Sequence, residues 1–255
     1  MGTAAEPPPR TAIVTGGARR IGAELCRALA ADGWHVLIHC HRSIDEAEAL
    51  REELGSASVV SADLAAPDAG EAVMAALPGL PPPALLVNNA SRFVLDSADD
   101  FSPDEWAAHL DANLRGPALL SQAFAARARA GGVIVNMLDA KVRQPNPDFF
   151  TYTVSKLGLA ALTELCARAW AERGIRVCGI APAVTLVSGE QSRENFDSVH
   201  ALNPLGRGVL VEHIVAALRF ILAAPTLTGE TILLDGGQRF LGLPRDVQLL
   251  ADGND

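Results

Sequence analysis

The stretch Thr11-Ala12-Ile13-Val14-Thr15-Gly16-Gly17-Ala18-Arg19-Arg20-Ile21-Gly22 joins a short apolar run to a glycine-rich segment. This order of residues predicts a strand over Thr11–Thr15, a tight turn and the start of a helix. Glycines at such a turn let the backbone approach a pyrophosphate, and the helix N-terminus adds unpaired N–H groups with partial positive charge. An ordinary turn between strand and helix has the same pattern. The location favours a dinucleotide site, with the expected contacts Gly16, Arg20, Ile21 and Gly22.

Short apolar runs alternate with longer helical segments along the rest of the chain. Several of these runs lack polar alternation, which is typical of strands covered on both faces. Repeated strand–helix units predict right-handed crossovers. We therefore expect an α/β fold: one doubly wound, Rossmann-like parallel sheet of seven strands with helices on both faces. The predicted strands are Thr11–Thr15, His35–Cys40, Ser58–Ala62, Ala84–Asn88, Val133–Leu138, Ile175–Ile180 and Thr231–Asp235.

Helix boundaries are indicated by capping residues. Ser43 opens a helix over Ile44–Leu54, Ser102 opens another, and Gly174 closes the helix that begins near Tyr152. These residue types satisfy backbone groups that a helix end leaves unpaired.

Domain organisation follows from the length of the chain and from its proline- and glycine-rich segments. Residues 1–10 contain three prolines and no long apolar run, which predicts a flexible leader, and 11–255 has the length of one domain. A Pro- and Gly-rich connector is expected over Leu77–Pro83, and the polar stretch Thr185–Pro204 is expected to be a mobile lid.

Composition excludes several classes of function. The net charge of −9 at pH 7 disfavours nucleic acid as a partner, because a polyanion would be repelled. No membrane association is expected. The four cysteines lack CxxC spacing, which predicts free thiols in a reducing compartment and a cytoplasmic protein. His39 and His41 have no suitably spaced carboxylate or cysteine partner, so no metal site is expected.

The predicted second strand ends in His41-Arg42-Ser43. In a doubly wound sheet this tip faces the adenosine ribose, where an acid would bind the 2′-hydroxyl and Arg with a hydroxyl suits a 2′-phosphate. The sequence therefore favours NADPH over NADH. A solvated basic loop, with Ser43 acting only as a helix cap, is the alternative.

Further cofactor contacts are expected where the third and fourth strands end. Asp63 and Leu64 could meet the adenine, and Asn89 and Ala90 could run along the cofactor. Each of the polar residues could instead be an ordinary capping or turn residue.

Tyr152 and Lys156 are four residues apart, so on one helix they lie on the same face. A phenol has a pKa of about 10, and a nearby ammonium would lower that pKa toward neutral pH. This spacing predicts a proton-donating tyrosine beside a lysine. A solvated lysine with a half-buried tyrosine is the alternative.

Taken together, the motifs resemble the short-chain dehydrogenase/reductase family over nearly the whole chain. The residues that carry this resemblance are the turn Thr15–Gly22, the segment Asn88-Asn89-Ala90, Asn113, Tyr152 and Lys156.

Departures from the usual family pattern make the chain most similar to pteridine reductases. Arg20 replaces the middle glycine of the turn, Phe93 follows Ser91 after the Asn-Asn-Ala segment, and Asp139 replaces the usual catalytic serine or threonine, thirteen positions before Tyr152. The His41-Arg42-Ser43 tip is the fourth such feature.

The resemblance implies roles for individual residues. Phe93 would stack a pterin against the nicotinamide, Arg20 and Ser91 would contact the ligand and phosphates, and Asn113 would hold a water that links Lys156 to solvent. Pro182 would adjoin the cofactor, and the following Ala183 stands where many relatives have glycine. The resemblance also implies a homotetramer.

Asp139 decides which chemistry we predict for the site. Reduction of a C=N bond needs a proton at nitrogen as hydride reaches carbon, and a carboxyl group suits that task. We therefore predict NADPH-dependent reduction of dihydropterins or dihydrofolate, with Asp139, Tyr152, Lys156 and Asn113 as catalytic residues. An Asp that only caps the next turn is the alternative for Asp139. For the function, the alternatives are a carbonyl reductase such as a 3-oxoacyl-carrier-protein reductase, and a protein that binds NADPH without turnover.

Overall fold

Seven parallel strands form one sheet in the computed structural model, which describes residues 8–250 except 129 and 190. The strands lie in the order β3-β2-β1-β4-β5-β6-β7. The predicted fold class is confirmed, and the expected strand bounds differ from those observed by one or two residues at most. The strands are β1 (Thr11–Val14), β2 (His35–Cys40), β3 (Ala57–Ser61), β4 (Pro83–Asn88), β5 (Val133–Met137), β6 (Arg176–Pro182) and β7 (Thr231–Leu234).

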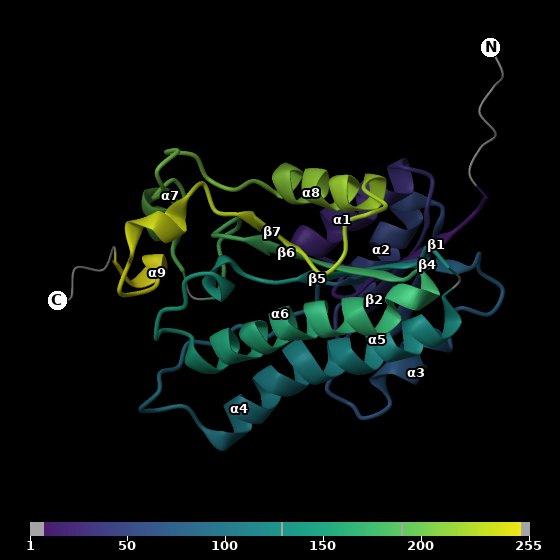
Figure 1. Cartoon of the computed structure of the whole chain (residues 1–255), viewed down its shortest axis with the longest axis horizontal. Helices are drawn as coiled ribbons and strands as arrows, with labels where there is room; N and C mark the ends of the chain where they lie inside the picture. The colour runs from purple at the N-terminus through teal and green to yellow at the C-terminus, as the bar shows by residue number, and fades with distance from the viewer. Residues whose placement is uncertain (1–7, 129, 190, 251–255) are drawn as a thin grey trace, which may run out of the picture.

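Helices cover both faces of this sheet. In Figure 1, α1, α2 and α8 lie on one side of the strands, and α3, α5 and α6 lie on the other. A single π-helical turn, Asp111–Arg115, connects α4 to α5. The helices are α1 (Arg20–Ala31), α2 (Ile44–Leu54), α3 (Ala69–Met74), α4 (Pro103–Leu110), α5 (Gly116–Arg127), α6 (Phe150–Trp170), α7 (Arg193–Val199), α8 (Val211–Ala223) and α9 (Val247–Leu250).

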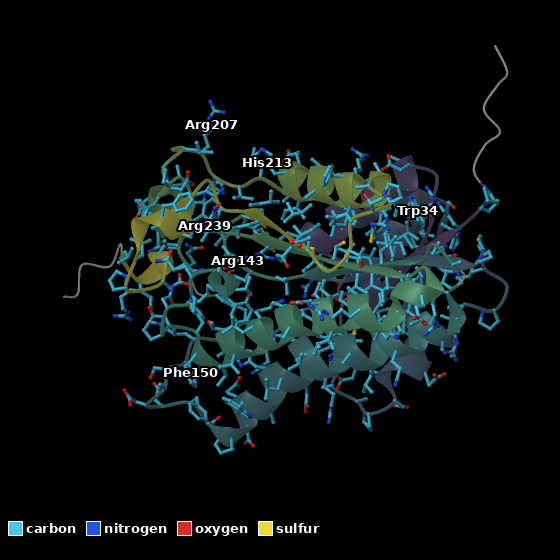
Figure 2. The ribbon with its side chains drawn as sticks, viewed as in Figure 1. Trp34, Arg143, Phe150, Arg207, His213 and Arg239 are labelled. Carbon is cyan, nitrogen blue, oxygen red and sulfur yellow. The ribbon has the colours of Figure 1, made fainter. Side chains whose placement is uncertain are left out.

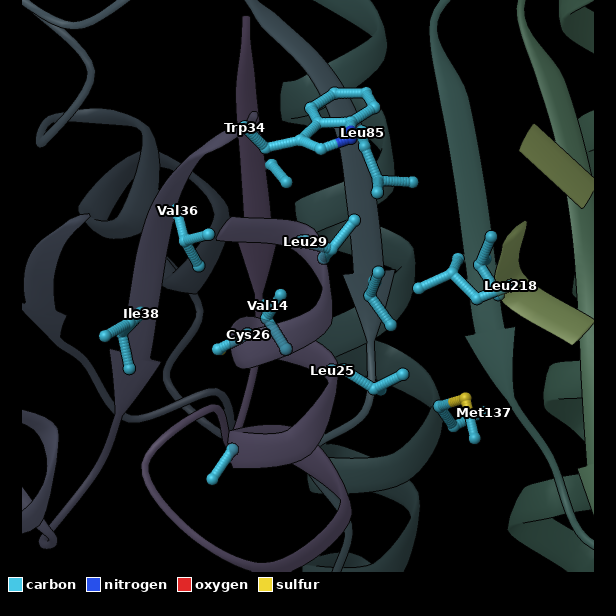
Figure 3. Packing of buried hydrophobic residues seen from close by; sticks show 14 of the residues in the cluster. Val14, Leu25, Cys26, Leu29, Trp34, Val36, Ile38, Leu85, Met137 and Leu218 are labelled. Carbon is cyan, nitrogen blue, oxygen red and sulfur yellow. The ribbon is translucent and has the colours of Figure 1, made fainter. Parts of the chain in front are cut away.

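The apolar strands have no solvent-facing side because each face has its own core. On one face, strand residues such as Val14 and Ile38 pack against Leu25 of α1 and Leu218 of α8 (Figure 3). Side chains alternate along a strand. The intervening residues, Ile13 among them, therefore enter a second core against α3 and α5. This explains why alternation is missing from the sequence of these strands.

Strand order determines where a ligand can bind. The chain leaves β1 toward β2 and β3 and then returns to place β4 on the other side of β1. At this reversal the connections diverge and leave a crevice outside the carboxyl ends of the strands. Those ends face the side of the molecule that carries α7 and α9 (Figure 1).

The expected helix caps have mixed outcomes. Ser102 Oγ accepts a hydrogen bond from Glu105 N–H at 3.1 Å, and Gly174 has φ of +68° after α6, so both caps are confirmed. The helix expected after Ser43 is present, but the Ser43 side chain makes no capping hydrogen bond. Ser43 is therefore the N-cap residue of α2, as predicted, but its hydroxyl takes no part in the cap.

The segment expected to be a mobile lid is partly helical. Within Thr185–Pro204 the chain forms α7, and Ser192 Oγ caps that helix by accepting from Asn195 N–H at 3.1 Å. Position 190, in the same segment, and residues 1–7 of the predicted leader lie outside the described residues. Within the described part of the chain, none of the helices combines the length and apolar character that a membrane crossing requires.

Candidate functional site

A cleft of about 990 Å³ runs along the carboxyl ends of the strands. It is bounded by the turn after β1, the tip of β2, the ends of β4, β5 and β6, and the C-terminal segment. All predicted site residues except Asn113 line it. These residues are Gly16, Arg20, Ile21, Gly22, His41, Arg42, Ser43, Asp63, Leu64, Asn89, Ala90, Ser91, Phe93, Asp139, Tyr152, Lys156 and Pro182.

The turn after β1 requires glycine at two positions. Gly16 has φ of +59°, and a Cβ placed on Gly22 would lie 2.1 Å from the Gly16 carbonyl oxygen. Arg20 adopts φ of +55°, so it has a glycine-like backbone conformation although it carries a side chain. A left-handed residue with a side chain costs roughly 1–2 kcal/mol. The turn therefore stores strain at the cleft to place an arginine there.

The end of β4 holds this turn in shape. Thr15 Oγ1 accepts from the backbone N–H groups of Asn89 and Ala90 at 2.9 and 3.0 Å. The Asn89 side-chain amide donates to the carbonyls of Thr15 and Gly16 at 2.9 and 3.3 Å. Asn89 thus organises the glycine turn as well as lining the cleft.

His39 is a further element of the turn that the sequence did not reveal. The Gly16 N–H donates to His39 Nδ1 at 3.3 Å, and His39 Nε2 lies 3.1 Å from the Ala62 carbonyl. These partners assign the ring proton to Nε2. Burial lowers the pKa of His39 to about 4, so the ring is neutral at pH 7. It connects β2 to the glycine turn and to the end of β3.

The tip of β2 presents polar groups to the cleft. His41 and Arg42 are exposed and Ser43 is half-buried. Because the Ser43 side chain makes no cap hydrogen bond, its hydroxyl is not used by α2. Beyond β3, Asp63 Oδ1 accepts from Ala65 N–H at 2.9 Å and shapes that loop.

At the other end of the cleft, the Tyr152 hydroxyl donates to Asp139 Oδ2 at 2.8 Å. The second oxygen, Asp139 Oδ1, accepts from Lys141 N–H at 2.9 Å and caps the short helical turn Ala140–Val142. Asp139 therefore makes both of the contacts that the sequence left as alternatives. One carboxylate oxygen caps a turn, and the other accepts a hydrogen bond from the phenol.

Lys156 lies one helical turn beyond Tyr152 and is buried with it. Its Nζ donates to the Met137 carbonyl at 2.8 Å and lies 5.7 Å from the centroid of the Tyr152 ring. Burial lowers the pKa of Lys156 to about 8.

The titration of Tyr152 differs from the prediction. Burial and the adjacent Asp139 carboxylate raise the pKa of the phenol well above 10, whereas the sequence predicted that Lys156 would lower it. Burial also raises the pKa of Asp139. Both shifts favour the protonated forms, because a charge in this enclosed site is poorly solvated. The environment of the Asp139–Tyr152 pair therefore favours neutral groups over charged ones.

Aromatic rings form one wall beside this pair. Phe93 stacks on Phe149 with ring centroids 4.2 Å apart and meets the Tyr152 ring edge-on at 4.7 Å. Phe149 has φ of +53°, an outlier for a bulky residue, which costs about 1–3 kcal/mol. Phe150 follows at the start of α6, at the end of the molecule where Arg239 lies on the segment after β7 (Figure 2). This strained turn places the Phe149 ring behind Phe93.

Asn113 is buried behind the cleft. Its Oδ1 accepts from Arg92 N–H at 2.7 Å, and its Nδ2 donates to Ser155 Oγ at 3.0 Å and to the Arg92 carbonyl at 2.9 Å. Ser91 Oγ also donates to Asn113 Oδ1, at 3.3 Å. The side chain of Asn113 thus fixes the loop that carries Phe93 to α6.

Comparison with known proteins agrees with this arrangement. The family model described as short chain dehydrogenase matches residues 10–197. The chain belongs to the short chain dehydrogenase family. It is 32% identical over 249 residues to 3beta-hydroxysteroid dehydrogenase 1 of Eggerthella lenta, covering 89% of this chain and 93% of that protein.

Two solved members of the family are similar in structure. They are FolM alternative dihydrofolate reductase 1 from Brucella canis and from Brucella suis, both complexed with NADP. The first has a TM-score of 0.86 and 37% identity, covering 91% of this chain and 94% of its own. The second has a TM-score of 0.85 and 38% identity, covering 91% and 95%.

The hydrogen bond between Asp139 and Tyr152 can be tested through Tyr152, which is the only tyrosine in the chain. We expect Asp139→Asn to lower the pH at which the phenol ionises, because the carboxylate that raises its pKa is removed. The measurement is the tyrosinate absorbance near 295 nm against pH. Tyr152→Phe should abolish the signal. A midpoint that stays unchanged in Asp139→Asn would show that the two groups are not in contact.

Proposed function

We propose that this protein is an NADPH-dependent pteridine reductase, which takes 7,8-dihydropterins or dihydrofolate to the tetrahydro state. The observation that carries this proposal is the carboxyl–phenol contact of 2.8 Å between Asp139 and Tyr152 at the Phe93 end of the cleft. A carbonyl reductase would be expected to have a hydroxyl at the position of Asp139.

The residues of the cleft fit NADPH. Gly16 and Gly22 let the turn pack tightly on itself and on Asn89 and Ala90, where a Cβ would clash, and so place the start of α1 at the cleft as a pyrophosphate site. Arg42 and the hydroxyl of Ser43 suit a 2′-phosphate. The bound cofactor would supply hydride from its nicotinamide. His41, Asp63, Leu64, Ala90 and Pro182 would complete its surroundings.

Proton delivery is the task of the Asp139–Tyr152 pair. Burial disfavours the charged forms of both groups, which suits the pair to donate a proton to a ring nitrogen of the substrate. Lys156 lies behind Tyr152 with a pKa of about 8 and can return a proton to the phenol. Asn113 would act at a distance, by fixing the Phe93 loop and Ser155.

Phe93 would orient the substrate. A flat pterin held between this ring and the nicotinamide presents one carbon to the hydride, which fixes the direction of transfer. Arg20 and Ser91 also line the cleft and would contact the pterin and the phosphates. The similarity to the two Brucella alternative dihydrofolate reductases supports this choice of substrate class.

We also propose a cytoplasmic homotetramer. Phe220 on α8 and Phe240 after β7 are 58% and 73% exposed. Large exposed apolar side chains such as these suit burial at a subunit contact.

The proposed function is tested by NADPH consumption with a panel of dihydropterins, dihydrofolate, simple ketones and 3-oxoacyl thioesters. We expect turnover of a dihydropterin or dihydrofolate. Asp139→Asn should lower kcat by about 10²–10⁴, the contribution of a positioned general acid, while NADPH binding stays intact. Turnover of the carbonyl compounds alone would contradict the proposal, as would tight NADPH binding with no turnover at all.

Arg20→Gly separates strain from function. Removing the left-handed side chain relieves roughly 1–2 kcal/mol, while the added glycine costs about 0.5–1 kcal/mol of entropy, so stability in urea should be unchanged or slightly higher. Loss of a charge-assisted hydrogen bond should lower kcat/KM for the dihydropterin by roughly 10–100-fold. Lower stability together with unchanged kcat/KM would contradict this role for Arg20.

A further inference from the structure

Two opposite charges are buried together at the Phe93 end of the cleft. Lys141 Nζ donates to Asp246 Oδ2 at 2.8 Å and to Asn146 Oδ1 at 2.6 Å. Lys141 and Asp246 are each 8% exposed, and both line the cleft. Neither residue belongs to the motifs that define the glycine turn or the Tyr152–Lys156 spacing.

Asp246 comes from the C-terminal segment, residues 243–248. Its own backbone N–H donates to Asp148 Oδ2 at 2.7 Å. Arg245 Nε donates to the same carboxylate, at 2.9 Å from Oδ1. The C-terminal segment is therefore held by two charged contacts to the loop between β5 and α6.

Lys141 connects this segment to Asp139. Its backbone N–H donates to Asp139 Oδ1 at 2.9 Å, while its side chain reaches Asp246. The Nζ also lies 5.3 Å from the centroid of the Phe149 ring, which stacks on Phe93. One residue thus contacts the proton donor, the aromatic wall and the C-terminal segment.

Stability alone does not explain such a pair. Taking two charges out of water costs several kcal/mol per ion, and apolar side chains of similar volume are often as stabilising. In a buried site, however, each charge acts strongly on its neighbours because little water screens it. The effect of the pair should therefore be sought in the titration of Asp139 and Tyr152.

We propose that the Lys141–Asp246 ion pair is an electrostatic positioning element of the active site, whose balanced charges govern how readily the Asp139–Tyr152 pair gives its proton to substrate. This proposal rests on the proposed function. Lys141 and Asp246 are positioning residues, because neither needs to touch the reacting atoms.

The charged groups that face the Asp139–Tyr152 pair shift its pKa values in opposite directions. Lys141 lowers the pKa of Asp139, and Asp246 raises the pKa values of both Asp139 and Tyr152. Lys156 faces the Asp139–Tyr152 pair from α6.

Two further neighbours contribute less. His109 of α4 lies 6.4 Å from Tyr152 between ring centroids, and burial lowers its pKa, so it is neutral at pH 7. Asp148 and Arg245 neutralise one another beyond Asp246.

The test removes each charge separately. Asp246→Asn leaves the positive charge of Lys141 unbalanced, so the Asp139–Tyr152 pair should lose its proton at lower pH. The alkaline limb of the kcat/KM profile should therefore move to lower pH by about half a pH unit or more. Lys141→Met leaves Asp246 unbalanced, so the limb should move up by a similar amount. Lys141→Arg keeps the charge and should stay close to the wild-type profile.

A readout independent of turnover comes from the single tyrosine. Asp246→Asn should lower the midpoint of phenol ionisation, followed at 295 nm. Glu164→Gln is the matched control, since Glu164 forms an exposed ion pair with Arg168 on α6 and should shift neither measurement. If a single variant fails to fold, the double variant Lys141→Met/Asp246→Asn removes both charges and should titrate close to the wild type.

The outcomes separate the two proposals. Shifts in opposite directions for the two single variants support the inference, since loss of packing would not reverse sign. Shifts in the same direction, or none, overturn it even if dihydropterins are reduced. If the wild type reduces no dihydropterin, the proposed function fails, and a lowered tyrosine midpoint in Asp246→Asn would still support the electrostatic role while an unchanged midpoint would overturn it.

Discussion

The hydrogen bond between the Tyr152 hydroxyl and Asp139 Oδ2 is the constraint around which the active site is arranged. Tyr152 is buried and Asp139 is half-buried beside it, so each carries a desolvation penalty as an ion, and sharing a proton avoids a second charge. The contact requires the end of β5 and the first turn of α6 to be held to within a few tenths of an ångström. The backbone N–H of Lys141 and the hydrogen bond of Lys156 to the Met137 carbonyl supply that restraint.

Strain is concentrated at the same cleft. Arg20 and Phe149 are the two residues other than glycine that have positive φ in the described part of the chain, and they lie at the cofactor turn and behind the aromatic wall. Each costs free energy that the surrounding cores must offset, which is a common feature of functional sites. The buried Lys141–Asp246 pair adds a third cost at the same place. Three costs at one cleft indicate that positioning, rather than stability, determined these residues.

The sequence predicted those parts of the molecule that depend on local pattern. Apolar runs such as His35–Cys40 mapped onto buried strands, and the spacing of Tyr152 and Lys156 placed both on one face of α6. Contacts between distant segments were missed, as with Lys141 and Asp246, which are 105 residues apart. The pKa of Tyr152 was predicted with the wrong sign because spacing reveals a neighbouring charge but not burial. The sequence suggested for His39 only the role of a metal ligand, which was rejected. Its role in the glycine turn depends on a hydrogen bond from Gly16, which follows the neighbouring strand β1.

A crystal structure of the protein with NADP and a bound pterin would test the central claim most directly. We expect the pterin to lie between Phe93 and the nicotinamide, with one ring nitrogen within hydrogen-bond distance, about 2.6–3.2 Å, of the Asp139 carboxyl or the Tyr152 hydroxyl. A pterin bound elsewhere would contradict the claim. So would Asp139 turned away from Tyr152 toward solvent in that complex.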